Sequence, residues 1–556
     1  MDAGLVILFG SLLAQGAYPM PWAVAAVAAV SWWAASRAPL ASGAAAWWLP
    51  WLGWSVLAAA SSSQPWAAVP VVARWGAALL FFAAASASWR EGERRRWLTV
   101  VWAAGAVLAV AGAWTGWRTG HYAGAHGLIF SGTSRYYGYT AFAVLAAAAA
   151  GLGAATHPSA DRRLRAAGFA AAALGTVYVA GSRSRGALLG LLAAAALVAV
   201  RRLGAAKAAL LLAAPLAAAL LVPASRDLLL KKDSRYQWGR VDQWRAAAAA
   251  AMDAPLHGWG PGNYRLGYLR HPVAAEGPVR YNLVSDHAHS EPLQAAAETG
   301  WAGLVLWALG FLLTLTPLLR PGPDPASAGA AAAAAGMAVM LLGDNLLQVP
   351  ALGFLYFSAL VCAGDAAVPW RVVLPRRALL ASGFLLTAGP LAPAARETGG
   401  AGPVEARVWR AAHALAFYPE DADLRAELAL LYESGGGYAG ADEQWARAQA
   451  TAPFNAVYAF RRGLLAQRRG DWEAAQRQHA RAAELEPAFR DARLGRAVAL
   501  WGAGRLAEAR EELAAAKTLA DPGPQGYAYA DIVAARDPGA LARVEAMLKR
   551  PSPRKP

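Results

Sequence analysis

Long apolar runs, separated by short polar or glycine- and proline-rich breaks, fill the chain up to about residue 393. A helix needs about 20 mostly apolar residues to cross a bilayer. The runs that reach or approach this length lie at 3–16, 21–36, 44–60, 66–87, 97–114, 137–154, 166–181, 186–200, 205–222, 293–319, 326–345, 350–367 and 377–393. Because the first, eighth and last are short, the pattern predicts an all-α, polytopic membrane protein with about 11–13 transmembrane helices.

One long polar interval, residues 223–292, interrupts these runs. Within it, Ser234 to Met252 is alanine-rich and predicts a helix, with Asp233 or Ser234 as its N-cap. Arg240 and Trp244 are four residues apart, so they share one face of that helix. The next stretch, 258–264, is rich in glycine and proline and therefore predicts a turn.

The composition changes at 398–403, which predicts a flexible linker before a soluble helical domain. Two kinds of residue then recur about every 34 positions, namely Pro419, Pro453, Pro487 and Pro522, and Gly436, Gly470 and Gly504. This register resembles tetratricopeptide repeats, whose stacked helix pairs bury a shared core in an α-solenoid. The predicted domains are N-terminal transmembrane helices (1–222), an outer-face loop with catalytic elements (223–292), C-terminal transmembrane helices (293–395) and the repeats (404–540).

The distribution of charge predicts how the helices are oriented. The chain is 57% hydrophobic and 16% charged, with a net charge of +16, which excludes an ordinary soluble protein. Its basic residues cluster between apolar runs, as cytoplasmic loops require, so we expect no nucleic-acid partner. The inside clusters are Arg37; Arg90, Arg94, Arg95 and Arg96; Arg162, Arg163 and Arg165; Arg201, Arg202 and Lys207; Arg320; and Arg371, Arg376 and Arg377. This parity places the turn at 181–186, the loop 223–292 and the repeats on the periplasmic side of a bacterial inner membrane.

Several short motifs resemble, in order, spacing and sidedness, those of the O-antigen ligase and polymerase superfamily. Ser-Arg-Gly at 184–186 resembles the family motif at the outer end of a span. Arg-x-x-x-Trp at 240–244 and the glycine-rich turn at 259–264 resemble its loop elements. His-Ser-Glu-Pro-Leu-Gln at 289–294, followed by Glu-Thr-Gly-x-x-Gly at 298–303, resembles its His-Asn-x-x-Leu-Gln…Glu-x-Gly-x-x-Gly signature.

The chain departs from the family pattern at two places. Ser290 stands where the family usually has Asn after the histidine. Ser-Arg-Tyr-Tyr-Gly at 134–138 stands where protein-glycosylating relatives often have a Pro-Asn pair. Both departures concern the acceptor rather than the donor.

The resemblance implies a C-type glycosyltransferase fold and a role in lipopolysaccharide biosynthesis. The implied reaction transfers a glycan from a polyprenyl-diphosphate carrier, such as undecaprenyl diphosphate, to an acceptor hydroxyl at the outer face of the bilayer, with inversion and without a metal or cofactor. A lipid A-core acceptor would make the protein an O-antigen ligase, a growing glycan a polymerase, and a protein side chain an oligosaccharyltransferase. The repeats favour a protein partner or acceptor, because such helical surfaces bind peptides or other domains.

This chemistry assigns roles to five residues. Arg185 and Arg240 are expected to bind the diphosphate and stabilise its growing negative charge, with Arg183 as a helper. His289 is expected to accept the proton of the attacking hydroxyl, because a neutral imidazole has a suitable pKa. His287 is expected to bind substrate or orient its neighbour.

Other interpretations stay open at this point. Asp286, His287 and His289 could instead bind a metal, since His-x-His supplies two ligands, although the single Cys362 excludes a cysteine metal site or a disulfide framework. A transporter would place ionisable groups within the spans, where Arg74 and Asp344 are the main examples. A scaffold that displays repeats would leave the arginines and histidines unexplained.

Overall fold

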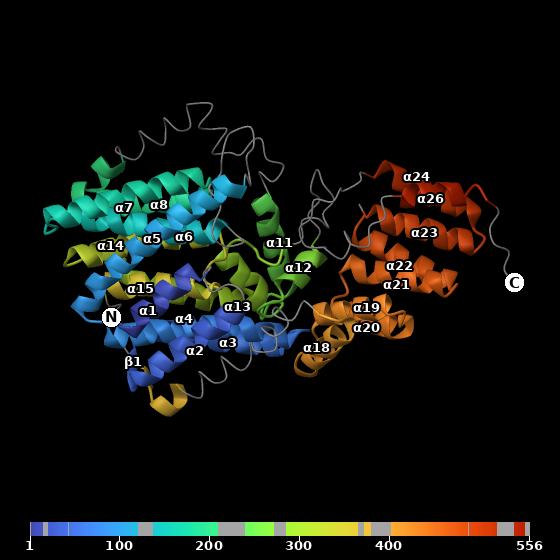
Figure 1. Cartoon of the computed structure of the whole chain (residues 1–556), viewed down its shortest axis with the longest axis horizontal. Coiled ribbons are helices and arrows are strands. Elements are labelled where there is room, and N and C mark those ends of the chain that lie inside the picture. The colour runs from blue at the N-terminus through green and yellow to red at the C-terminus, as the bar shows by residue number, and fades with distance from the viewer. Residues whose placement is uncertain are drawn as a thin grey trace.

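The computed structural model covers the whole chain, and it describes residues 2–14, 20–42, 44–119, 137–209, 239–271, 285–364, 372–379, 402–487, 489–519 and 539–550. Three parts follow one another along its long axis (Figure 1). Apolar helices form one end and the repeats form the other. The loop helices α11 (Gly239–Asp253) and α12 (Tyr264–Arg270) lie between them.

The apolar end is a bundle of helices, as the sequence predicted. The helices are α1 (Ala3–Leu13), α2 (Met20–Ser36), α3 (Leu49–Ala60), α4 (Ala68–Ser88), α5 (Glu91–Thr119), α6 (Tyr137–Ala155), α7 (Arg162–Gly181), α8 (Arg185–Leu203), α13 (Glu291–Thr314), α14 (Pro325–Leu342) and α15 (Pro350–Ala363). Short 3-10 turns, η2 (Ala44–Trp48), η3 (Pro65–Ala67) and η5 (Thr316–Leu319), adjoin α3, α4 and α13. Among the described residues, seven helices are long and apolar enough to cross a membrane, and α1, α2 and α15 contribute shorter apolar helices. The predicted runs 205–222 and 377–393 lie largely outside the described residues.

The described residues also contain one feature that the sequence did not predict. Strands β1 (Leu40–Ser42) and β2 (Val372–Leu374) pair antiparallel, with Leu40 opposite Leu374. The pair ties the connection after α2 to the segment after α15. It does not change the all-α character of the fold.

Small residues bring α14 close to its neighbours. A Cβ on Gly153 of α6 would lie 2.5 Å from the carbonyl oxygen of Ala328, and one on Gly190 of α8 would lie 2.5 Å from that of Gly336. Such contacts let helix backbones approach closely within a membrane. Gly186, four residues before Gly190, faces Met340, four residues after Gly336. The helices α8 and α14 are therefore antiparallel, and the start of α8 lies beside the end of α14.

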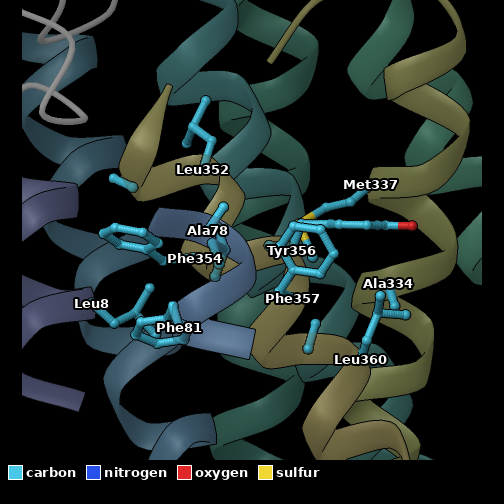
Figure 2. Packing of buried hydrophobic residues seen from close by; sticks show 14 of the residues in the cluster. Leu8, Ala78, Phe81, Ala334, Met337, Leu352, Phe354, Tyr356, Phe357 and Leu360 are labelled. Carbon is cyan, nitrogen blue, oxygen red and sulfur yellow. The ribbon is translucent and has the colours of Figure 1, made fainter. Parts of the chain in front are cut away.

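Helix α15 is buried along its whole length between α4 and α14. Phe354 stacks on Phe81 of α4 with ring centroids 4.9 Å apart, and Phe357 stacks on Phe82 at the same distance. Figure 2 shows Phe354 directed toward Phe81 and Tyr356 directed toward Met337 of α14. This aromatic packing fixes the segment 343–349, which links α14 to α15.

The C-terminal domain is a solenoid of tetratricopeptide type. After α18 (Val404–Phe417) come three helix pairs, namely α19 (Ala422–Ser434) with α20 (Tyr438–Thr451), α21 (Ala456–Arg468) with α22 (Trp472–Leu485), and α23 (Arg490–Gly502) with α24 (Leu506–Thr518), followed by α26 (Ala540–Met547). The recurring glycines, Gly436, Gly470 and Gly504, each lie between the two helices of a pair with φ of 78°, 74° and 83°. Residues other than glycine rarely adopt this left-handed backbone conformation, which explains why glycine recurs at this position of each repeat.

The repeats pack directly on the loop, although a linker precedes them. The ring of Trp259 in the loop meets that of Phe454 edge-on at 6.4 Å, and the Arg270 guanidinium lies 5.4 Å from the Phe454 ring centroid. Nearer the membrane helices, Trp66 and Tyr418 make an edge contact at 6.3 Å. These contacts involve large aromatic side chains, which dominate the energetics of such interfaces. The repeats therefore pack against both the loop and the membrane helices.

Candidate functional site

A buried aspartate, Asp344, joins two of the predicted site residues. His289 Nδ1 lies 3.0 Å from one carboxylate oxygen, and Arg240 Nη2 lies 3.0 Å from the other. Asp344 follows the end of α14, Arg240 starts α11, and His289 lies in the loop before α13. Three segments that are distant in sequence therefore meet at one carboxylate.

The predicted helix face of Arg240 and Trp244 builds this site. Arg240 Nη1 donates to the carbonyl oxygen of Gly343 at 2.6 Å, and Trp244 Nε1 donates to that of His289 at 3.0 Å. The two side chains lie one turn apart on α11. This helix therefore fixes both the end of α14 and residues 285–290, the histidine loop. The predicted start of this helix at Ser234 lies outside the described residues.

The backbone at His289 is held in an uncommon conformation. Its φ is 49°, in the left-handed region that residues other than glycine seldom adopt. The next residue, Ser290, donates its backbone N–H to Asn345 Oδ1 at 2.8 Å, which fixes the loop to the residue after Asp344. This bond and the one from Trp244 to the carbonyl oxygen of His289 together fix the peptide group between His289 and Ser290, which holds the imidazole beside Asp344.

The electrostatics favour one tautomer of His289. The Asp344 side chain is only 2% exposed, whereas His289 is 24% and Arg240 28% exposed. A carboxylate beside Nδ1 favours the tautomer with a proton on Nδ1, which leaves the lone pair on Nε2 to accept a proton. The site therefore combines a proton acceptor with a guanidinium, both reachable from solvent and both oriented by one buried charge.

Arg183 and Arg185 lie at the same end of the bundle. Ser184 begins α8 as its N-cap, where its hydroxyl accepts from the Ala187 N–H at 3.3 Å. Arg183, just before it, has φ of 50°, and it shares this left-handed backbone with His289 and no other non-glycine residue of the described chain. Since the start of α8 lies beside the end of α14, the two arginines and Asp344 lie at the same end of this helix pair.

His287 sits beside this group without joining its hydrogen bonds to Asp344. Its backbone N–H donates to Ser285 Oγ at 3.3 Å. Burial lowers the pKa of His287, the charges of His289 and Arg74 lower it further, and Asp286 opposes them. A lowered pKa keeps the His287 ring neutral at pH 7. Asp286 lies 3.9 Å from Arg265. Among the described residues, no three histidine, cysteine, aspartate or glutamate side chains are grouped so that they could hold a metal ion.

The glycine-rich turn packs against the first turns of α13. Gly262 N–H donates to Glu298 Oε1 at 3.0 Å, and Gln294 Nε2 donates to the same oxygen at 2.7 Å. Gly300 has φ of 70° and kinks α13, and a Cβ there would lie 2.4 Å from the carbonyl oxygen of Leu256. Glu298 thus binds the glycine-rich turn, and the Gly300 position requires glycine. The glycine-rich turn and the kinked helix α13 together support the histidine loop, which directly precedes α13.

Sequence reasoning missed the role of Asp344. It marked this residue only as an ionisable group near the end of a predicted span, where such groups are costly and usually functional. That signal could have identified Asp344 as a site residue. Its partners could not have been named, because they lie 55 and 104 positions away.

Part of the chain matches a known protein family. Residues 170–308 match the family model described as O-antigen ligase. The chain carries an O-antigen ligase domain. The predicted site residues Arg183, Arg185, Arg240, His287 and His289 all lie within the matched segment, and Asp344 lies beyond it. The family resemblance expected from the motifs is therefore confirmed.

Two solved structures resemble the chain weakly. One is YrrB, a TPR protein with an unusual peptide-binding site, at 18% identity over 29% of this chain and 83% of that one, with a TM-score of 0.23. The other is MamA MSR-1 C2, at 20% identity over the same shares, with a TM-score of 0.22. No curated protein matches the chain.

Proposed function

We propose that the O-antigen ligase domain transfers a glycan from a polyprenyl-diphosphate carrier to an acceptor hydroxyl at the periplasmic face of the bacterial inner membrane. The observation that carries this proposal is the bridge from His289 through Asp344 to Arg240. It joins a general base and an anion-binding group within hydrogen-bonding reach of one buried carboxylate. Glycan transfer from a diphosphate needs both groups at one place.

In the proposed step, His289 Nε2 takes the proton of the acceptor hydroxyl as its oxygen attacks the anomeric carbon. The bond between that carbon and the diphosphate oxygen breaks, and the diphosphate leaves with the electron pair. Arg240 and Arg185 stabilise the leaving charge, and Arg183 and His287 help to bind the donor. One direct displacement inverts the anomeric centre. The arginines supply the positive charge in this mechanism, so we propose no metal or cofactor.

The alternative transporter function rests on Arg74 and Asp344 as charges within the spans. Asp344 instead follows the end of α14 and is paired with two groups of the loop region. A carboxylate held in this way orients its partners and is less suited to load and release an ion. This pairing favours the enzyme.

Purified protein in nanodiscs should be given a polyprenyl-diphosphate glycan with lipid A-core, a glycan or a peptide as acceptor. We expect one acceptor class to gain the glycan while polyprenyl diphosphate is released, at a rate that a chelator leaves unchanged. Transfer that stops with chelator and returns with added divalent metal would overturn the metal-free mechanism. Movement of intact donor between leaflets without cleavage would support the transporter.

The orientation can be tested with single cysteines in a Cys362→Ala background. Met252 in α11 is 65% exposed, and the side chains of Glu484 in the repeats and Arg95 at the start of α5 are 67% and 69% exposed. We expect a membrane-impermeant thiol reagent to label Met252→Cys and Glu484→Cys in spheroplasts. Arg95→Cys should react only after the membrane is opened. Labelling of only one of the Met252→Cys and Glu484→Cys proteins would contradict the shared face of loop and repeats, and labelling of Arg95→Cys in intact spheroplasts would contradict its place on the opposite side.

A further inference from the structure

A cavity of about 230 Å³ opens at the end of the bundle opposite Asp344, between the ends of α6 and α8 and the start of α14. Two of its lining residues, Arg201 and Arg202, belong to the last turn of α8. Since water occupies about 30 Å³ per molecule in the liquid, the cavity has room for a phosphate group with a few waters. It is separate from the candidate active site by most of the length of α8.

The walls of this cavity are fixed by hydrogen bonds. Arg201 Nη2 donates to the carbonyl oxygens of Leu318 and Arg320, both at 2.6 Å. His157 Nδ1 accepts from the Ser159 N–H at 3.3 Å, so its Nε2 carries the proton and faces the carbonyl oxygen of Gly322 at 3.3 Å. Both contacts tie α6 and α8 to the loop before α14. The cavity is therefore a built feature of the fold.

The charge of the cavity is positive and lacks a counter-ion in the described part of the chain. Neither Arg201 nor Arg202 makes an ion pair there, and Arg201 meets only neutral carbonyl oxygens. The aspartates of the adjoining loops are engaged as helix N-caps, since Asp161 accepts from the Leu164 N–H at 2.7 Å and Asp324 from that of Ala326 at 2.8 Å. A partly buried guanidinium without a counter-ion is costly, and a bound anion would offset that cost.

The location selects the class of anion. The cavity lies at the end of membrane-spanning helices, and the outer face of α8 exposes apolar side chains, with Leu189 57%, Val200 45% and Leu203 48% exposed. This face is suited to lipid tails, so the arginines lie at the depth of the headgroups. Basic pockets between helix ends at this depth bind acidic lipid headgroups. A zwitterionic headgroup is less suitable, because it would bring its own positive charge close to those of the arginines.

We propose that this cavity binds the phosphate of an anionic phospholipid. The site takes one headgroup, with Arg201 and Arg202 as its charged ligands, and it is independent of the proposed glycan transfer. A bound headgroup would join the ends of α6 and α8 to the start of α14. It would therefore stabilise the helix pair, α8 and α14, whose other end carries Asp344.

The test is native mass spectrometry of the full chain released from nanodiscs of phosphatidylcholine. The nanodiscs also contain roughly 20% phosphatidylglycerol, which gives the bilayer an anionic surface. We expect wild-type protein to retain one phosphatidylglycerol in preference to phosphatidylcholine. At about 1 kcal/mol for each arginine, Arg202→Gln should lower that preference about 5-fold and the Arg201→Gln, Arg202→Gln double variant about 25-fold. The matched control, Arg162→Gln with Arg163→Gln, changes two arginines of the same membrane end outside the cavity and should keep the preference.

Two results would overturn the proposal. One is an unchanged preference for phosphatidylglycerol in the Arg202→Gln and double variants. The other is equal loss of preference in the control, which would indicate a diffuse surface charge. Inorganic phosphate provides the remaining arm, because complete displacement of the lipid by millimolar phosphate would identify a free-phosphate site instead. If the double variant does not fold, Arg202→Gln alone decides between these outcomes.

Discussion

Two histidine–aspartate–arginine groups occur in the region of the loop, and they differ in nearly everything except composition. In the first, Asp344 joins His289 and Arg240. In the second, Asp253 lies 2.5 Å from His271 Nε2 and 2.9 Å from Arg270 Nε. The members of the Asp253 group lie at most 18 positions apart in the sequence, at the ends of α11 and α12.

Burial and geometry separate the two groups. The Asp253 side chain is 22% exposed and its Arg270 partner 47%, so water screens their attraction and the pair contributes little to stability. Asp344 is 2% exposed, so loss of either partner would leave its buried negative charge without full compensation, which is strongly destabilising. Asp344 also binds the Nδ1 side of its histidine, whereas Asp253 binds Nε2. Residue types alone therefore do not define a site, whereas burial, the bound ring nitrogen and convergence of distant segments do.

The histidines should show the largest difference. We expect His289→Ala to lower glycan transfer about 100-fold to 10,000-fold, because it removes the general base. Donor binding should persist, since the arginines remain. His271→Ala is the matched control and should transfer at close to the wild-type rate. Rates are measured with radiolabelled donor in nanodiscs, together with donor binding by filter assay.

An equal loss in both histidine variants would place the effect in loop folding. Full transfer by the His289→Ala protein would remove the proposed mechanism, and the loop would then be only a connection between helices.

The aspartates come next. Asn in place of Asp344 can donate to Nδ1, which would leave the proton on Nε2, the atom that must accept one. We therefore expect Asp344→Asn to lower transfer about 100-fold, with a loss that higher pH does not repair. It should also lower the midpoint of thermal unfolding, because Arg240 loses its buried counter-ion. Asp253→Asn should change neither quantity appreciably, and comparable losses in the two variants would argue against a special role of Asp344.

Some of this site could be predicted from the sequence because it depends on local spacing. Arg240 and Trp244 were expected to share a face, and both contact the site from α11. Gly436, Gly470 and Gly504 were expected to mark a repeat, and each occupies the same left-handed position. Helical period and glycine backbone freedom act within a few residues, so the chain itself reveals them.

The long-range contacts could not be predicted in the same way. Nothing near Asp344 in the sequence indicates that it meets His289, because that contact depends on how α11, α13 and α14 pack. The docking of the repeats on the loop was also missed. The linker at 398–403 suggested independent domains, whereas Phe454 and Tyr418 pack against Trp259 and Trp66. Such aromatic contacts lie far apart in sequence and follow no period.

Lysine substitutions sharpen the comparison of the two arginines. Arg240 uses two nitrogens for two acceptors, Gly343 and Asp344, and a lysine ammonium cannot reproduce that planar fork. We expect Arg240→Lys to lower the turnover number about 30-fold, in keeping with the loss of one charged hydrogen-bond donor. Arg270→Lys keeps a charge beside exposed Asp253 and should lower turnover less than about 2-fold. Equal turnover in the two proteins would show that the charge of Arg240 suffices without its geometry.

A third arginine, Arg265, connects the histidine loop to the repeats and should give the smallest effect. It lies on α12 with Nη1 3.2 Å from Asp423 of the first repeat and Nε 3.9 Å from Asp286, one residue before His287. Tyr458 of the second repeat donates to the same Asp423 at 3.2 Å. The repeats can therefore position the histidine loop through Arg265 without supplying a catalytic group.

We expect Arg265→Gln to lower turnover about 10-fold with little change in the KM for donor, because a small displacement of the general base slows the reaction without weakening donor binding. Hydrogen exchange at 285–290 should become faster in the same protein. Arg270→Gln, on the same helix and also against the repeats, is the control, because Arg270 contacts Phe454 and Asp253 and makes no hydrogen bond or ion pair with the described residues 285–290. Unchanged exchange at 285–290 in Arg265→Gln would show that the repeats dock on the loop without positioning it.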